Sequence, residues 1–279
     1  MTLNNLFYNH VLGPLPKKWM SHYMGVLAQW QTPPQINKKL IERFARHYKI
    51  NLDEIEKPLH QYSSLSEFFA RRLKKGARII EGDVVHPCDG LLIESGKMHN
   101  NKLIQAKGKS YTLKDFIPNN PWTDDFAEGS FFTYYLAPHN YHRVHSPVSG
   151  AVDWSSLVPG ELWPVNSWSV KNIEGLYAVN ERVATGLITP QGKVILVMVG
   201  ATNVGSMSFT FDPNIHTNIP GKKEAVFRQY SDQRHLQVGE EFGVFNLGST
   251  VALLFVKSWG FQHLSRREVL MGQRFNKNS

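Results

Sequence analysis

Cysteine is almost absent from this sequence, since Cys88 is the only one among 279 residues. A single thiol excludes a disulfide within the chain and fits a reducing compartment. Long hydrophobic runs are also missing, because the longest ones, 194–201 and 251–256, fall far below the ~20 residues that a membrane-spanning helix needs. The first thirty residues contain no basic stretch followed by a clean apolar one, so we expect no signal peptide. We therefore expect a chain that does not cross a membrane.

Charged residues are scarce as well. They make up 19% of the chain against 42% hydrophobic residues, which indicates a globular and not a disordered protein. The sequence shows no internal repeat, no low-complexity segment and no doubly wound alternation of strands and helices. The length allows one large core or two small ones, and because Gly and Pro are spread throughout, we expect one core.

Positive charge is concentrated in the N-terminal quarter. The net charge of the whole chain is +8, and residues 1–75 hold 12 Lys or Arg against 5 Asp or Glu, a net charge of +7. This asymmetry indicates a polyanionic partner, either nucleic acid or an anionic bilayer. Nucleic acid is the weaker alternative, because no recognition motif or regular aromatic–basic interleaving is present. We expect a membrane partner and no nucleic-acid partner.

Residues 1–80 are predicted to form a basic region of three amphipathic helices that faces the membrane. The first covers about residues 17–30, and the second carries an apolar stripe from Ile36 to Tyr48. The third opens with a capping box, Ser64-x-x-Glu67, and continues to Leu73. Each Lys or Arg near an anionic leaflet adds about 1 kcal/mol of attraction. The alternative is that the helices pack on their own domain and expose their basic faces to water.

From Val84 onward the sequence changes to short runs rich in β-branched and aromatic residues, which Gly, Pro and Asn turns divide. We therefore predict an α+β fold, with a mostly antiparallel β core and amphipathic helices at the N-terminal end. The β-rich catalytic core is expected to cover residues 81–279. Its clearest predicted strands are 91–93, 130–136, 194–199, 206–211 and 251–256.

One β-type run, from Phe245 to Phe255, is interrupted by Gly248-Ser249. Glycine inside a strand pattern usually indicates a bulge or a close backbone approach. Because Gly248 has no side chain to shield its carbonyl, the Oγ of Ser249 could attack that carbonyl if a base removed its proton. The plain alternative is a bulge that contains a serine.

Three histidines, His139, His142 and His145, follow one another at every third position. On a helix this spacing would place three imidazoles on one face, as in a zinc site, but Pro138 and Pro147 bracket the run and argue against a helix. We therefore expect no metal. Because histidine titrates near neutral pH, His142 or His145 can act as a base toward a serine. The alternative is that one or two of them, His139 above all, only fill structural hydrogen bonds.

A base of this kind usually needs an acceptor that fixes its tautomer. Asp89 lies in a turn that ends at Gly90 and is suited to hold an imidazole, although the local sequence alone favours the alternative, a turn residue that caps its own backbone. Ser249, His145 and Asp89 are also compatible with a serine hydrolase that acts on an external ester or peptide, but the Gly-x-Ser-x-Gly elbow is missing. A third alternative is a basic binding protein without enzymatic activity.

Seven segments of the sequence resemble the bacterial phosphatidylserine decarboxylase proenzymes and follow one another in the same order, and the similarity covers nearly the whole chain. One departure is Cys88, where the family usually has alanine before the aspartate. The segments are Phe68–Lys74, Pro87–Gly90, Tyr141–His145, Pro159–Asn166, Asn180–Val183, Val199–Ser206 and Leu247–Thr250.

This resemblance implies that the chain cleaves itself between Gly248 and Ser249, into a large chain 1–248 and a small chain 249–279. Ser249 would be the self-cleaving serine, His145 its general base and Asp89 the residue that orients the base. Ser249 would then become a covalent pyruvoyl group, the Schiff-base centre, with neither a metal nor pyridoxal phosphate as cofactor. His142 would be a second histidine that donates a proton in the decarboxylation step.

The resemblance also implies the substrate and the location. The substrate would be phosphatidylserine in an anionic membrane, and the products phosphatidylethanolamine and carbon dioxide. The two cleavage chains would stay together as a heterodimer, and these would pair into a homodimer. The protein would be peripheral, on the cytoplasmic face of the cell membrane. Because residues three apart in a straight strand face opposite sides, His142 and His145 reach one site only if the backbone turns between them.

Overall fold

The computed structural model describes residues 30, 33–106, 109–202, 206–219, 221, 223–246 and 249–275. The first predicted helix, at residues 17–30, lies outside this part of the chain except for Trp30. Gly248 also lies outside it, whereas Ser249 is described by its backbone. Within the described residues, no helix combines the length and the apolar character that crossing a bilayer requires.

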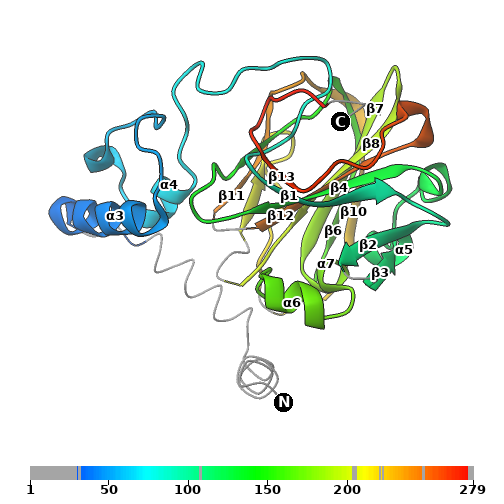
Figure 1. Cartoon of the computed structure of the whole chain (residues 1–279), viewed down its shortest axis with the longest axis horizontal. Coiled ribbons are helices and arrows are strands. Elements are labelled where there is room, and N and C mark those ends of the chain that lie inside the picture. Colours follow the sequence, from blue (N-terminus) through cyan, green and yellow to red (C-terminus); the bar gives the residue numbers. More distant parts are fainter. Residues whose placement is uncertain are drawn as a thin grey trace.

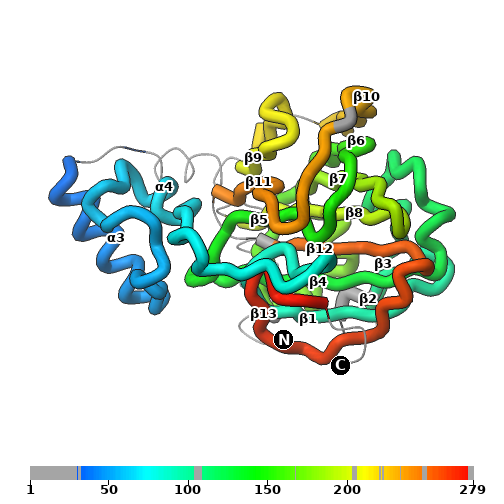
Figure 2. Tube along the Cα trace, turned by 90° about the horizontal axis from the view of Figure 1, so that it is seen from above, coloured from blue at the N-terminus to red at the C-terminus, as the bar shows by residue number. Residues whose placement is uncertain are grey.

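The second and third predicted helices are present. Helix α3 (Pro34–Tyr48) begins with a proline and ends before Lys49, whose left-handed conformation (φ 54°) is common after helices. A short 3₁₀ helix, η2 (Leu59–Gln61), precedes helix α4 (Leu65–Phe69). This region has a small apolar cluster of its own, and α3 and α4 lie to one side of the sheets, beside strand β11 (Figures 1 and 2). The buried members of the cluster are Ile41, Ala45, Ile50, Ile55, Tyr62 and Phe68.

Helix α4 is shorter than the sequence pattern indicated. The Oγ of Ser64 accepts the backbone N–H of Glu67 at 3.1 Å, but the Glu67 carboxylate binds the residue before Ser64, so the capping box is only half formed. The prediction that this helix continues to Leu73 was wrong, since it ends at Phe69. Leu73 forms an antiparallel bridge with Ile55 instead. Pairing with a distant backbone segment therefore outweighs a short helical pattern.

Most of the remaining chain forms antiparallel β-sheets, which confirms the predicted α+β fold with helices at the N-terminal end. One sheet has eight strands in the order β10-β6-β7-β8-β12-β4-β1-β13, a second has three in the order β5-β11-β9, and a third pairs β2 with β3. Each of the five predicted strands overlaps an observed one. The strands are β1 (Gly90–Lys97), β2 (Lys102–Ala106), β3 (Lys109–Thr112), β4 (Ser130–Leu136), β5 (Arg143–His145), β6 (Gly150–Val158), β7 (Arg182–Thr189), β8 (Gly192–Val199), β9 (Met207–Phe209), β10 (Val226–Leu236), β11 (Glu241–Phe245), β12 (Ser249–Phe255) and β13 (Arg267–Val269).

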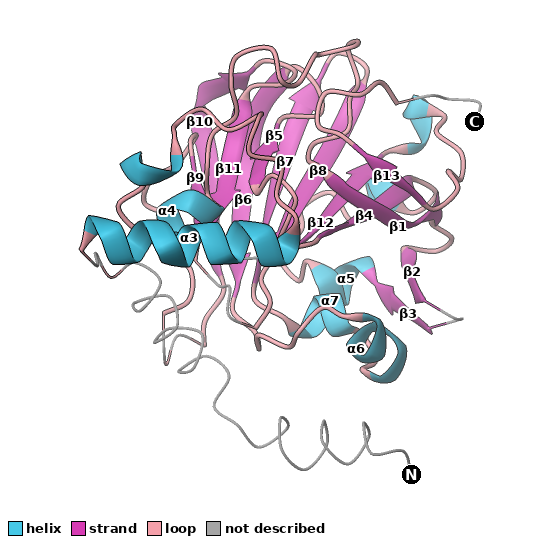
Figure 3. Ribbon diagram, turned by 60° about the vertical axis from the view of Figure 1, so that its left-hand side comes forward, coloured by secondary structure: helices cyan, strands magenta, loops and turns pink. Residues whose placement is uncertain are grey.

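Short helices fill the connections between these strands, and Figure 3 shows three of them gathered beside β2 and β3. Those three are α5 (Leu113–Phe116), α6 (Ser167–Asn172) and α7 (Leu176–Val179). Two 3₁₀ turns, η3 (Asp124–Phe126) and η4 (Lys257–Trp259), complete the set in the described residues.

The eight-stranded sheet is buried on both faces, which explains why strand β12 is apolar at nearly every position. Val251, Leu253 and Phe255 belong to one apolar cluster, whereas Ala252 and Leu254 belong to the other, as the two-residue period of a strand requires. Strands β5, β9 and β11 contribute side chains to the first cluster, and helices α5 and α7 to the second. The small sheet and the short helices thus cover opposite faces of the large sheet.

The run from Phe245 to Phe255 is divided between two sheets. Strand β11 ends at Phe245 in the three-stranded sheet, and strand β12 begins at Ser249 in the eight-stranded one. The plain alternative, one continuous strand with a bulge at Gly248-Ser249, is therefore wrong, because the two halves of the run pair with different neighbours. Residues 246–248 connect the two sheets.

The C-terminal segment runs back along the segment that leads to Asp89. Strand β13 pairs with the start of β1, and Val85 forms a bridge with Arg274. Backbone hydrogen bonds of 2.9–3.0 Å join His86 to Gln273 and Phe275 to Val84. Residues C-terminal to Ser249 therefore help to position the turn that carries Asp89.

Candidate active site

The predicted histidines lie on a short loop that begins where strand β4 ends. Residues 137–142, named here the histidine loop, open with a turn closed by Asn140. Its Oδ1 accepts the backbone N–H of Ala137 at 2.8 Å, and its own N–H donates to the Ala137 carbonyl at 2.9 Å. Local hydrogen bonds thus fix this turn without help from distant residues.

His142 is fully buried, with an exposed fraction of 0%. Its Nδ1 lies 2.9 Å from the carbonyl oxygen of Asn140, and because a carbonyl only accepts, Nδ1 carries the hydrogen and Nε2 has a free lone pair. The ring packs against that of Phe69, with the centroids 4.0 Å apart. Burial, and second the positive charge of Arg71, lower the pKa of His142 to about 3. The ring is therefore neutral at physiological pH.

His145, in strand β5, has different neighbours. Its Nδ1 donates to the Gly239 carbonyl at 2.8 Å, and its Nε2 lies 3.1 Å from the hydroxyl of Tyr141. Burial lowers the pKa of His145, so this ring also favours the neutral form of a base. Its backbone N–H donates to the Pro87 carbonyl at 2.8 Å, which places strand β5 next to the turn that carries Asp89.

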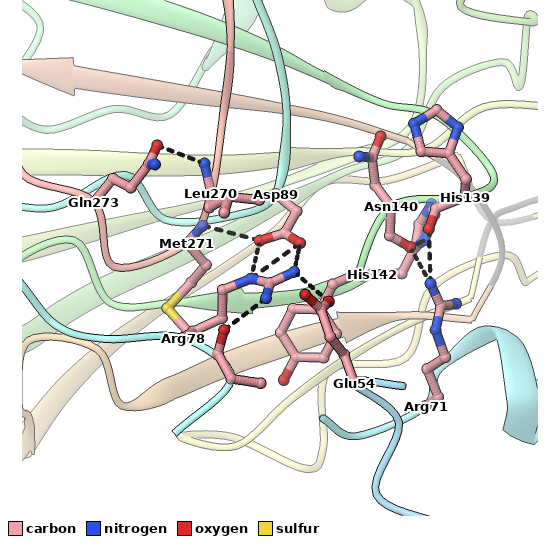
Figure 4. A network of polar contacts seen from close by, with 12 residues as sticks. Glu54, Arg71, Arg78, Asp89, His139, Asn140, His142, Leu270, Met271 and Gln273 are labelled. Atoms are coloured by element: carbon pink, nitrogen blue, oxygen red, sulfur yellow. Dashed lines mark hydrogen bonds and ion pairs between the residues drawn. The ribbon is translucent and has the colours of Figure 1, made fainter. Parts of the chain in front are cut away.

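The Asp89 carboxylate is held by a buried guanidinium (Figure 4). Arg78 donates from Nε to Oδ1 at 2.9 Å and from Nη2 to Oδ2, and the backbone N–H of Met271 donates to Oδ1 at 2.9 Å. Nη2 of Arg78 also lies 3.1 Å from Glu54. Burial alone would lower the pKa of Arg78, but its hydrogen bond to Asp89 and the charge of that carboxylate raise it. The next residue is Gly90, where a Cβ would lie 2.6 Å from the Tyr135 carbonyl.

Asp89 and His145 are close but do not form the hydrogen bond of a catalytic triad in this structure. The charge of Asp89 makes a small contribution that raises the pKa of His145, while the Nδ1 of His145 is bonded to the Gly239 carbonyl. The role of Asp89 in orienting His145 stays a prediction. Its alternative role, capping its own turn, is not what the carboxylate does, because its backbone partner is Met271.

Ser249 lies directly beside the histidine loop. It is the first residue of β12 and pairs with Leu136, the last residue of β4, after which the loop begins. On the other side of residues 246–248, the backbone N–H of Phe245 donates to the carbonyl of His142 at 3.0 Å. The loop therefore contacts both strands that flank the predicted cleavage site.

The three histidines do not share one set of partners. His139 is exposed, and its backbone carbonyl accepts from Arg71 at 2.8 Å, whereas His142 and His145 are buried among different residues. In the part of the chain that the structure describes, no group of three His, Cys, Asp or Glu side chains is placed to hold a metal ion.

Sequence reasoning missed the polar partners of the site, namely the buried side chains of Arg71, Arg78 and Tyr141 and the partly exposed one of Glu54. Arg71 and Tyr141 fell in segments that carried the resemblance, but nothing in their spacing indicated burial. The one available signal was the position of Arg71 directly after the apolar run Phe68-Phe69-Ala70, where a surface residue would be the ordinary expectation.

Buried ionisable groups with shifted pKa values, gathered where two rigid sheets meet, are typical of an enzyme. Comparisons with known proteins specify which class. Residues 65–277 match the family model described as phosphatidylserine decarboxylase. The chain belongs to the phosphatidylserine decarboxylase family.

Relatives from several bacteria support this assignment, and each is described as a phosphatidylserine decarboxylase proenzyme. The chain is 40% identical to the one from Anaeromyxobacter sp. (strain K) over 91% of this chain and 90% of the relative. It is 40% identical to that of Actinobacillus pleuropneumoniae serotype 3 (strain JL03), over 97% and 93% of the two chains. Identity to the Myxococcus xanthus (strain DK1622) protein is 35%, over 91% and 90%.

Proposed function

We propose that this protein decarboxylates phosphatidylserine to phosphatidylethanolamine, using a pyruvoyl group that it makes from its own Ser249. The family supports the reaction, and the word proenzyme in the names of its relatives supports processing of the chain. The observation that carries the proposal is the position of residues 246–248, between two strands that are each paired in a different sheet. Cleavage there leaves both new ends anchored.

Self-cleavage begins when Ser249 Oγ attacks the carbonyl carbon of Gly248, with His145 taking the hydroxyl proton. The peptide bond breaks as the ester forms, and the amine of residue 249 takes up a proton. Loss of the Cα proton of residue 249 then expels the Gly248 carboxylate and leaves a dehydroalanine, which tautomerises and hydrolyses to a ketone and ammonia. The exchange of an amide for an ester is unfavourable by itself, and the elimination drives it forward because it consumes the ester.

The residues of this site fit a pyruvoyl group at position 249. The N-terminus of β12 is held by pairing with Leu136, so the group would sit beside the histidine loop. There it would supply an electron-withdrawing carbonyl that takes up the electrons left when carbon dioxide departs. His142 would bring the proton: its Nε2 lone pair has no partner in the described residues, and an anionic substrate beside it would favour protonation. Once protonated at Nε2, His142 would donate that proton to the carbon that lost the carboxylate.

The two chains, 1–248 and 249–279, stay together as a heterodimer, because β12 lies between β4 and β8 inside the large sheet. We also propose that these heterodimers pair into a homodimer. The basic region 1–80 brings the protein to the cytoplasmic face of the cell membrane as a peripheral protein, where its anionic substrate is concentrated.

Replacing Ser249 tests the proposal. On a denaturing gel, the purified wild-type protein should give two fragments and decarboxylate phosphatidylserine in mixed micelles. Ser249→Ala should give one full-length band and no measurable carbon dioxide release. The matched control is Ser258→Ala, which removes an exposed hydroxyl from the same chain and should leave cleavage and activity unchanged. An uncleaved wild-type chain that hydrolyses esters would favour the serine hydrolase instead.

A further inference from the structure

Arg71 is a buried arginine whose hydrogen-bond partners in the described residues are all backbone carbonyls. Its exposed fraction is 3%, and it lies two residues after the end of helix α4, behind the C-cap residue Ala70. Its Nη2 donates to the carbonyls of His139 at 2.8 Å and Asn140 at 2.9 Å, and its Nη1 to that of Phe69 at 3.4 Å. Placing a cation in the interior without a carboxylate to bind it costs stability, so the arrangement calls for a reason other than stability.

One of the three carbonyl oxygens that Arg71 contacts, that of Asn140, also holds His142. The carbonyl oxygen of Asn140 accepts from Nη2 of Arg71 and from Nδ1 of His142, both at 2.9 Å (Figure 4). A carbonyl has two lone pairs, so the two donors fill its capacity and fix its direction. The positive charge also disfavours a second proton on the ring, and burial and this charge act on the His142 pKa in the same direction.

The residues around Arg71 make two further contacts, one with the histidine loop and one with the start of strand β5. The Phe69 ring covers His142, and the carbonyl of Ala70 accepts from Nε of Arg143, the residue after His142, at 3.0 Å. By contrast, the ring of His145 is held by Tyr141 and Gly239, neither of which Arg71 contacts through a hydrogen bond. Arg71 is therefore placed to act on one histidine and not on the other.

We propose that Arg71 is a positioning residue for the decarboxylation step, which it serves by holding the Asn140 carbonyl that keeps the His142 ring in a single tautomer with Nε2 free. This inference rests on the proposed function, in which His142 moves a proton. It assigns a role in the site to the N-terminal region, since Arg71 lies between helix α4 and the β core. Self-cleavage, which uses His145, does not depend on Arg71.

The direct test is the tautomer of His142, which needs no activity assay. In ¹⁵N-histidine-labelled protein at pH 7, the His142 ring should give the signals of a neutral ring with hydrogen on Nδ1, identified by their loss in His142→Gln. In Arg71→Met, which keeps the length of the side chain but removes charge and donors, both tautomers should appear and the His142 pKa should rise. Arg72→Met is the matched control, because the side chain of Arg72 is 57% exposed, and it should leave the His142 signals unchanged.

The kinetic test separates this role from a merely structural one. Arg71→Met should still yield the two fragments, while kcat falls about tenfold to a hundredfold and KM changes less than about threefold. Arg71→Lys keeps the charge but loses the planar fork, so it should fall between the wild type and Arg71→Met. If Arg71→Met does not fold, Arg71→Lys carries the test, with smaller changes of the same sign.

Two outcomes would overturn the inference. The first is a His142 ring whose tautomer and pKa are the same in the wild type and in the variants. The second is loss of cleavage and activity together with no change in the His142 signals, which would make Arg71 structural only. A wild-type chain that neither cleaves nor decarboxylates would instead refute the proposed function, while the tautomer measurement would still decide whether Arg71 holds the ring.

Discussion

The Asp89 carboxylate accepts hydrogen bonds from two donors of one guanidinium and from a backbone N–H, all in the interior. Asp89 and the Arg78 side chain are 3% and 8% exposed, so neither charge is solvated by bulk water. The pair therefore depends on its own geometry, and Glu54 shares the guanidinium from a more exposed position. Removing one member leaves the other as an uncompensated buried charge.

Replacing Arg78 alone should be strongly destabilising. In the uncleaved Ser249→Ala background, Arg78→Met should lower the free energy of unfolding by roughly 3–5 kcal/mol, because the buried Asp89 carboxylate would lose the guanidinium that binds it. Urea unfolding followed by tryptophan fluorescence measures this. The double variant with Asp89→Asn should recover part of the loss, since both charges are then removed. A loss below about 1 kcal/mol for Arg78→Met would contradict this view of the pair.

Residue types could be predicted from the sequence, but most of their partners could not. The segments around Asp89 and the histidines indicated reactive groups, and the structure does bring Ser249 next to the histidine loop. Arg71 and Arg78 were not identified, because burial of an arginine is decided by tertiary packing and leaves at most a weak local pattern, such as the apolar residues before Arg71. The expected hydrogen bond between Asp89 and His145 is not formed in this structure, because Asp89 binds Arg78 and the Nδ1 of His145 binds the Gly239 carbonyl.

At the scale of elements, helix α3 has two apolar faces with different surroundings. Ile41 and Ala45 are buried in the cluster of the N-terminal region, whereas Ile36 and Leu40 are 58% and 45% exposed. Trp30, which precedes the helix, is 68% exposed. Exposed basic residues lie on the same helix, namely Lys38, Lys39, Arg43 and Arg46. Apolar side chains beside basic ones are what an interfacial helix presents to anionic lipid.

The exposed face of α3 should therefore bind anionic vesicles. Ile36→Ser with Leu40→Ser should weaken sedimentation with phosphatidylserine vesicles about tenfold or more, because each buried aliphatic side chain is worth about 1.5–3 kcal/mol. Ile188→Ser is the matched control, since Ile188 is 45% exposed but lies on strand β7 of the eight-stranded sheet, outside the N-terminal helical region. Equal losses in the two proteins, or none in either, would refute a membrane role for α3.

Element types were largely predictable because their patterns are local. The apolar stripe of α3 and the β-type runs of β4, β8 and β12 follow from periodicity alone. Two boundaries were not predictable. Helix α4 ends early because the chain after it pairs with the segment around Ile55, and the run from Phe245 to Phe255 is divided because its halves join different sheets. Both depend on strand partners that are distant in sequence.

At the scale of the whole molecule, the fold keeps histidines in the interior in their neutral form. Burial lowers the pKa of His86 and of His142 to about 3, and His86 has its Nδ1 2.9 Å from the hydroxyl of Tyr134. In the unfolded chain, histidine takes up a proton near pH 6.5. Between these values the unfolded state binds more protons than the folded state, so its population grows as pH falls.

Stability should consequently decrease on acidification from pH 6.5 toward pH 3. The contribution of these histidines to the free energy of unfolding is fully present above pH 6.5. Below that pH it declines by about 1.4 kcal/mol per pH unit for each buried ring. Urea unfolding of the Ser249→Ala protein at several pH values measures the slope. His86→Phe should reduce the slope of the unfolding free energy against pH by about 1.4 kcal/mol per pH unit, the amount that one bound proton contributes. His60→Gln, at an exposed position, serves as the control. A slope that His86→Phe does not change would contradict this account.

The α+β class could be predicted for the whole chain, because helical periodicity and β-rich texture occupy separate parts of the sequence. The arrangement of two sheets around one connection could not, since it depends on how β5, β9 and β11 pair with one another. That arrangement bears on the proposed self-cleavage. It places the bond between Gly248 and Ser249 where the chain passes from one sheet to the other.

The central claim is that Ser249 is converted into the ketone that the reaction requires, and the intact mass of active wild-type protein tests it most directly. Mass spectrometry of denatured, freshly purified enzyme should find two chains, one ending at Gly248 and one beginning at residue 249. The smaller chain should be lighter than a serine-started peptide by one ammonia, and borohydride should add two hydrogens to it. A fully active protein that consists of a single unbroken chain with an unmodified serine at 249 would contradict the account.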